Sequence, residues 1–145
     1  MKLSTTQRAY IAGFLDGDGS VYVRVKPNDT YRYKFQIVGT IAFFQSAKSA
    51  DTFTQFHQLL GVGTMRKRKD GILEITVCRT DDINAFVKSV GPYVRAKRKQ
   101  IELLVKVLDL KRDMRNVQDF EKLMQLVDTY RELNYSKNRK HRITP

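Results

Sequence analysis

The chain is short and strongly basic: its 145 residues include 27 lysines and arginines against 15 aspartates and glutamates, a net charge of +12. This length favours a single domain over residues 1–145, and the charge favours a polyanionic partner. Nucleic acid fits better than an acidic membrane surface, because the sequence has no long apolar span, and we expect no membrane partner. The single cysteine, Cys78, excludes an intramolecular disulfide and a multi-cysteine zinc site.

A first helix is predicted from Thr5 or Thr6, either of which would serve as N-cap, to about Leu15. Small residues recur at every fourth position and form a stripe that a second helix could approach closely: Ala9, Gly13 and Gly17. Glycine costs a helix about 1 kcal/mol relative to alanine, and a close helix contact would offset that cost. Two acids, Asp16 and Asp18, follow with one glycine between them, and a simple helix end at Gly17 and Gly19 would explain this segment equally well.

Four strands are predicted in two hairpins. Residues 20–26 alternate valines with polar side chains, a turn signal follows at 27–29, and a second strand covers 31–44. A helix over 46–60 leads to the second hairpin, 64–69 and 72–78, which turns at Asp70-Gly71. Asp81-Asp82 would cap a short helix, and helices near 96–112 and 117–134 complete the chain. The order αββαββα predicts an α+β domain with helices on one face of an antiparallel sheet and the other face open.

The open face mixes hydrogen-bond donors and acceptors, which suits base edges in the major groove better than a uniformly basic, phosphate-binding surface would. The first hairpin contributes Tyr22, Arg24, Lys26, Asn28, Tyr31, Arg32, Lys34, Gln36 and Thr40. The second hairpin contributes Arg66, Arg68, Glu74 and Thr76. Val38 adds an apolar group that would read DNA shape or a thymine methyl. A solvated outer face without a ligand is the alternative interpretation.

Residues 11–19 resemble the nine-residue motif of the LAGLIDADG homing endonucleases, matching its alanine, its first glycine, both aspartates and its final glycine. The likeness runs from this motif through both hairpins to a basic tail over 134–145. It implies one endonuclease domain with the fold of that family, which dimerises through the motif helices. The residues implied at this dimer interface are Ala9, Ala12, Gly13 and Asp16.

The resemblance also implies a metal-dependent hydrolysis of phosphodiesters. Asp18 and the backbone carbonyl of Gly17 would hold Mg²⁺ or Mn²⁺, and Ca²⁺ would support binding without cleavage. Gln45 would order solvent near the scissile phosphate, and Lys97 would polarise water or stabilise developing charge. Ser49 departs from the family pattern, which has an arginine there. The tail would contact the DNA backbone through Ser136, Lys137, Lys140 and His141.

The implied function is that of a homodimer that binds a long pseudo-palindromic site in double-stranded DNA and breaks both strands, leaving short 3′ overhangs. A non-cleaving module on the same fold is the alternative, such as a maturase acting on intron RNA or a transcription factor. A ribosomal or other RNA-structural protein fits the charge and leaves the acidic helix end unexplained. The family occurs in chloroplasts, mitochondria and microbes.

Overall fold

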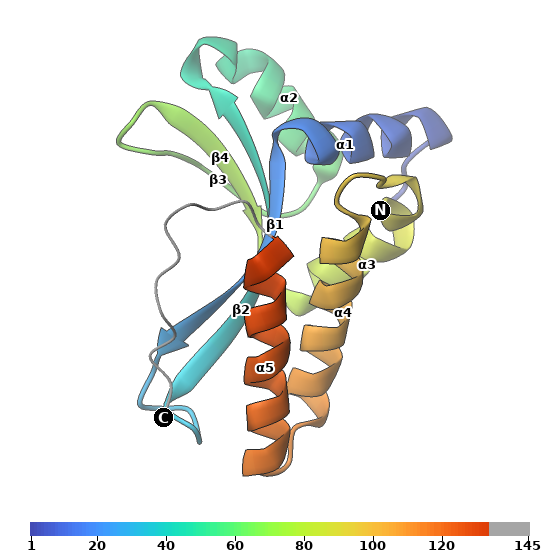
Figure 1. Ribbon diagram of the computed structural model, residues 1–145. Coiled ribbons are helices and arrows are strands. Elements are labelled where there is room, and N and C mark those ends of the chain that lie inside the picture. The colour runs from blue at the N-terminus through green and yellow to red at the C-terminus, as the bar shows by residue number, and fades with distance from the viewer. Residues whose placement is uncertain (134–145) are drawn as a thin grey trace.

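The computed structural model describes residues 1–133 and confirms the predicted α+β class and the order of elements (Figure 1). The helices and strands are α1 (Thr5–Asp18), β1 (Gly19–Pro27), β2 (Phe35–Ser46), α2 (Ala50–Leu60), β3 (Thr64–Lys67), β4 (Ile72–Val77), α3 (Thr80–Ser89), α4 (Arg98–Asp113) and α5 (Val117–Leu133). Two short 3₁₀ turns, η1 (Ala47–Ser49) and η2 (Gly91–Tyr93), precede α2 and α4.

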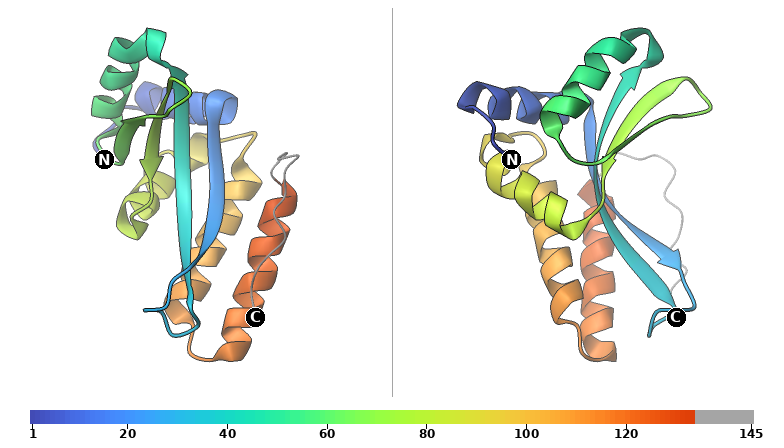
Figure 2. Two further views of the ribbon diagram at one scale, coloured as in Figure 1. Left: turned by 90° about the vertical axis from the view of Figure 1, so that its left-hand side faces the viewer. Right: turned by 180° about the vertical axis from the view of Figure 1, so that it is seen from behind.

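The strands form one antiparallel sheet in the order β1-β2-β4-β3, so the second hairpin joins the first through β4. The helices lie on one side of this sheet, with α4 and α5 side by side along its length and α1 across its upper end (Figures 1 and 2). The other face carries no helix of the described chain. None of the helices within residues 1–133 is long and apolar enough to span a membrane.

Aromatic side chains fix α1, α2 and α3 on the middle of β2. Phe43 of β2 lies 5.0 Å from Phe56 of α2 and 6.1 Å from Phe86 of α3, measured between ring centroids. Phe14 of α1 lies 4.6 Å from Phe56. Each aromatic pair contributes about 0.5–1.5 kcal/mol beyond the burial of its area. This cluster therefore locks the end of α1 and the end of β2 into one rigid unit.

The first helix begins and ends differently from the prediction. Its N-cap is Ser4, not Thr5 or Thr6: the Ser4 hydroxyl accepts from the Gln7 backbone N–H, and the Gln7 side chain accepts from the Ser4 N–H at 2.9 Å. This reciprocal capping box satisfies two backbone donors, which a single threonine cap would not do. The helix then continues past Leu15 to Asp18, so both acids of the motif belong to its last turn.

Two further boundaries also differ. The second strand begins at Phe35 rather than 31, because residues 28–34 form a closed turn in which the Asn28 N–H donates to the Lys34 carbonyl at 2.8 Å. Lys34 has a φ of 61°, a left-handed conformation that cannot continue a strand. At α3, Arg79 is the N-cap and its side chain makes no capping hydrogen bond. Asp81 and Asp82, the predicted caps, lie inside the first turn of that helix.

The second hairpin has two glycines with left-handed backbone conformations, Gly63 before β3 and Gly71 between β3 and β4, which allow a matched test of close packing. Both have positive φ, 88° and 82°, but a Cβ at Gly63 would lie 2.8 Å from the Thr76 carbonyl oxygen, whereas one at Gly71 meets nothing within 4 Å. Gly71→Ala should lower the free energy of unfolding by about 1–2 kcal/mol from backbone strain alone. Gly63→Ala should cost about 1–3 kcal/mol more, from overpacking. Denaturant unfolding measures both, and equal losses would contradict the clash.

Candidate active site and nucleic-acid interface

The motif carboxylate lies where α1 passes directly into β1. Asp18 is the last residue of the helix and is exposed, and Gly19, the C-cap, is already the first residue of the strand. A Cβ at Gly19 would lie 2.6 Å from the Leu15 Cδ1 atom and 2.7 Å from the Leu15 carbonyl oxygen. Only glycine fits this close turn, which brings the Asp18 carboxylate to the edge of the sheet.

Asp18 and Gln45 line the same pocket, a space of about 430 Å³ between α1 and α2. Gln45 lies near the end of β2, where its Oε1 atom accepts a hydrogen bond from the Ser46 N–H at 2.8 Å. Aromatic rings of Tyr10 and Phe14 form part of the wall. Two of the three residues predicted to act in catalysis are thus brought together, although they come from different elements.

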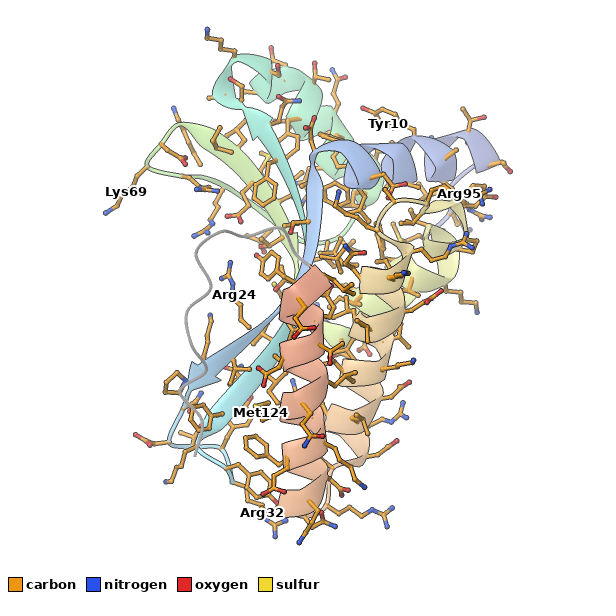
Figure 3. The ribbon with its side chains drawn as sticks, viewed as in Figure 1. Tyr10, Arg24, Arg32, Lys69, Arg95 and Met124 are labelled. Atoms are coloured by element: carbon orange, nitrogen blue, oxygen red, sulfur yellow. The ribbon has the colours of Figure 1, made fainter. Side chains whose placement is uncertain are left out.

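Tyr10 is a pocket residue that the sequence analysis did not assign. Its side chain is half exposed, and Figure 3 shows it on α1. Tyr10 stands four residues before Phe14 and eight before Asp18, so the three share one helix face. This spacing could have placed Tyr10 at the site from the sequence.

Lys97, the third predicted catalytic residue, is attached to the last turn of α1 by a reciprocal contact with Asp16. The Asp16 carboxylate accepts from the Arg95 N–H at 2.8 Å and from the Lys97 N–H at 3.0 Å. The Lys97 Nζ atom donates to the Asp16 carbonyl oxygen at 2.7 Å. Asp16, predicted at a dimer interface, therefore uses its carboxylate within its own chain.

The other residues predicted at a dimer interface divide by exposure. Ala9 and Gly13 are exposed, and a Cβ added at Gly13 or Gly17 meets nothing within 4 Å. Ala12 is only 1% exposed, because it packs into the core of its own chain. The prediction that Ala12 contacts a second chain is therefore wrong, whereas the small-residue stripe is open.

The donor set at the end of α1 fits a hard divalent cation such as Mg²⁺. Residues 1–133 contain no group of three or more histidines, cysteines or acids that could hold a metal ion. Magnesium keeps several waters and needs only one or two carboxylates plus phosphate oxygens, whereas zinc sites need three or four protein ligands. At this helix end the exposed Asp18 offers one carboxylate, and the predicted second ligand, the Gly17 carbonyl, belongs to the residue before it.

On the open face of the sheet, Tyr22 and Arg24 form a pair. The Arg24 Nη2 atom donates to the Tyr22 hydroxyl at 2.8 Å, and the guanidinium lies 4.8 Å from the ring centroid. Burial raises the pKa of the Tyr22 hydroxyl, and the neighbouring Arg24 cation opposes that shift. Tyr22 therefore stays neutral and can donate or accept. Arg24 projects away from the helices, toward the free side of the sheet (Figure 3).

Two predicted contact residues on this face are buried. Glu74 is 3% exposed, and Arg66, directly opposite on β3, reaches its Oε2 atom at 2.6 Å. Thr40 is 1% exposed beneath its cross-strand neighbour Tyr22, and its hydroxyl lies 3.5 Å from the Cys78 sulfur. The expectation that Thr40 and Glu74 present exposed groups is wrong, because larger side chains on the adjacent strands cover them.

The turn of the first hairpin also departs from the prediction. The Arg32 Nη1 atom donates to the Arg115 carbonyl at 3.0 Å, so this guanidinium faces the connection between α4 and α5 rather than the open face (Figure 3). The Lys34 Nζ atom donates to the Asp29 carbonyl, and the Asn28 side chain accepts from the Thr30 N–H and hydroxyl. These side chains brace the turn itself.

The remaining predicted contacts stay accessible to different degrees. Exposed side chains are those of Arg24, Lys26, Tyr31, Arg66 and Arg68. Partly buried side chains are those of Tyr22, Gln36, Val38 and Thr76. Four residues predicted in the tail lie outside the described residues: Ser136, Lys137, Lys140 and His141.

Comparison with known proteins gives consistent matches. A family model described as LAGLIDADG endonuclease matches residues 11–108. The chain is 30% identical over 132 residues to the DNA endonuclease I-CreI of Chlamydomonas reinhardtii, covering 90% of this chain and 80% of that protein. It is 29% identical over 117 residues to the DNA endonuclease I-CvuI of Chlorella vulgaris, covering 81% and 71%.

Solved structures show the same fold. The crystal structure of I-CvuI in complex with its target superposes with a TM-score of 0.86 at 26% identity, covering 93% of this chain and 86% of that one. The archaeal intron-encoded I-Vdi141I, complexed with DNA, gives a TM-score of 0.80 at 16% identity over 94% and 89%, a likeness of fold alone. The family match includes the motif helix, both hairpins and the segment before α4. The chain therefore belongs to the LAGLIDADG endonuclease family, as the motif at residues 11–19 predicts.

Proposed function

We propose that this chain is a site-specific DNA endonuclease that acts as a homodimer. It binds a long pseudo-palindromic site through the major groove and makes a metal-dependent double-strand break with short 3′ overhangs. The observation that carries the proposal is the convergence at the end of α1: Asp18 shares a pocket with Gln45, and Lys97 bonds to the same helix turn. A module that only binds nucleic acid would need none of these three together.

The relatives support a divalent metal and a DNA partner. I-CvuI was crystallised with its target in 2 mM Ca, and with the I-CreI target in 2 mM Mg with the DNA not cleaved. These complexes support only that a divalent ion accompanies DNA in that relative. From the single exposed carboxylate at the end of α1 we propose Mg²⁺ as the cofactor, Mn²⁺ as a substitute, and Ca²⁺ as an ion that supports binding without cleavage.

The proposed chemistry divides the work among few residues. The Asp18 carboxylate and the Gly17 carbonyl would hold a Mg²⁺ ion at the helix end. When bound, that ion would activate a water and neutralise charge on the phosphate and the leaving oxygen. The Gln45 amide orients solvent beside the phosphate by hydrogen bonding. The Lys97 ammonium stabilises the negative charge that develops on the phosphate oxygens.

A homodimer follows from the number of acids. Each chain offers one suitable carboxylate, and cutting two strands requires two such sites. The exposed small residues of α1 allow two copies of this helix to pack closely, which would bring the two Asp18 carboxylates together. In this dimer the basic residues on the two hairpins of each chain would contact one half of the DNA site.

Asp18→Asn should abolish cleavage and spare DNA binding, because the amide cannot replace the anionic oxygen ligand of the metal. The measurement is digestion of a genomic DNA library with Mg²⁺, with every new end sequenced and both proteins run in parallel. Recurrent ends at one long two-fold site, absent with the variant, are expected. Cleavage by Asp18→Asn would refute the metal assignment, and binding without any cleavage by the wild type would favour the non-cleaving module.

Gly13→Leu should convert the dimer into a monomer, because a Cβ at this position meets nothing within its own chain and the larger side chain would block a second α1. Gln125→Leu, on the exposed side of α5, is the matched control and should remain dimeric. Light scattering after gel filtration gives the mass of each. A dimeric Gly13→Leu protein would exclude this interface.

Arg68→Ala should relax specificity at one base position in each half-site, with a loss of discrimination of about 1–3 kcal/mol. Its guanidinium is partly exposed and oriented by Asp70 at 2.8 Å, an exposed pair worth about 0–1 kcal/mol to stability. Lys69→Ala, at the tip of the same hairpin (Figure 3), should instead weaken binding to all DNA sequences by the same factor. Binding to a library of single-base variants distinguishes the two, and uniform weakening by Arg68→Ala would make it a phosphate contact.

A further inference from the structure

The N-terminus of α4 lacks any capping group of its own. Lys97 is the N-cap residue and makes no side-chain capping hydrogen bond, and the first turn contains no acid. Arg98 and Lys99 occupy that turn instead, although cations at a helix N-terminus oppose the positive end of the helix dipole. The segment before α4 therefore needs an acceptor from elsewhere in the chain.

Asp16 supplies that acceptor from the last turn of α1. Its Oδ2 atom accepts from the Arg95 N–H at 2.8 Å, and its Oδ1 atom accepts from the Lys97 N–H at 3.0 Å. Both carboxylate oxygens are thus used, each in a charge-assisted hydrogen bond. The carboxylate fixes the backbone on both sides of Ala96 and sets the direction in which the Lys97 side chain leaves it.

Lys97 returns a bond to the same residue, because its Nζ atom donates to the Asp16 carbonyl at 2.7 Å. A lysine side chain has four rotatable bonds, and here both its root and its tip are attached to one residue. The ammonium is therefore held beside the helix turn that ends in Asp18. Asp16 is therefore the group that determines this placement.

We propose that Asp16 is a positioning residue that holds the Lys97 ammonium in register with the Asp18 carboxylate; this inference rests on the proposed endonuclease function. Asp16 does not touch the reacting atoms. It acts through the backbone of residues 95–97, because each of its carboxylate oxygens accepts a hydrogen bond from one of those two N–H groups. The contact also sets the spacing between the metal-holding and charge-stabilising groups, since both depend on one turn of α1.

The test is single-turnover cleavage of the site identified for the wild type, with saturating DNA and Mg²⁺. Asp16→Asn replaces one acceptor oxygen by an NH₂ group that repels a backbone N–H, so the cleavage rate should fall about 10- to 100-fold with the DNA affinity in Ca²⁺ unchanged. Asp81→Asn is the matched control: like Asp16→Asn it removes the charge of an aspartate near a helix N-terminus, and it should cleave at the wild-type rate.

A double-mutant cycle with Lys97→Met separates positioning from a general structural effect. If Asp16 acts through Lys97, adding Asp16→Asn to Lys97→Met should change the rate less than about twofold, because the group being positioned is already gone. Equal fold losses in both backgrounds, or a wild-type rate for Asp16→Asn, would overturn the inference. Should Asp16→Asn fail to fold, Asp16→Ser retains one capping oxygen and serves in the same cycle.

The two proposals fail in distinguishable ways. No cleavage of any DNA by the wild type removes the proposed function and this inference with it. Cleavage by the wild type, with Asp18→Asn inactive and Asp16→Asn fully active, removes only the positioning role. If raising the Mg²⁺ concentration restores the cleavage rate of Asp16→Asn to the wild-type value, Asp16 acts in metal binding instead. That result would also overturn the inference.

Discussion

The contact between Gly19 and Leu15 is the constraint on which the arrangement of the site depends. Leu15 is fully buried, and the absent side chain of Gly19 lets β1 leave the helix within one residue. Because the aromatic cluster holds α1 against β2, this turn has one position relative to the sheet. Asp18 is then exposed at the end of the sheet, and Asp16 is directed toward the segment before α4. A longer connection would let the last turn of α1, which carries both acids, shift relative to the sheet and to Gln45.

The open face of the sheet combines fixed and free polar groups. Glu74 is buried and needs its partner, since an unpaired buried carboxylate would cost several kcal/mol. Arg66 therefore has little freedom, and the same holds for Tyr22, which is bonded to Arg24. Side chains that are already ordered lose less entropy when they contact a ligand. The pairs are thus preorganised, and Arg68 is oriented by Asp70, whereas Lys26 is exposed and can adapt to a ligand.

Local patterns predicted most of the fold, because valine alternation, the Asp70-Gly71 turn and helical periods each depend on residues close in the chain. The element boundaries that were predicted wrongly depend on the backbone conformation of one residue, such as the positive φ of Lys34. The predicted exposure of Thr40 and Glu74 was wrong for another reason. The alternation of residues assigns a side chain to one face of the sheet, whereas its neighbours on the adjacent strands decide how exposed it is. At the site, the motif identified Asp18, and resemblance alone indicated Gln45 and Lys97. The hydrogen bonds that the Asp16 carboxylate accepts from the N–H groups of residues 95 and 97 join segments far apart in the sequence, and no local pattern predicts them.

The sparseness of the donor set has a consequence for specificity under the proposed function. One carboxylate per chain would hold a hydrated divalent ion weakly, and residues 1–133 contain no group of three or more histidines, cysteines or acids that could hold it instead. Under this proposal phosphate oxygens and the second chain would complete the site, so the metal would be bound well only when two copies lie correctly on DNA. Binding energy from the hairpins is then used to assemble the catalytic centre, which is the logic of induced fit. An enzyme built in this way discriminates at the cutting step as well as at binding, because a poorly matched site leaves Asp18 without the oxygens that complete the coordination of its metal.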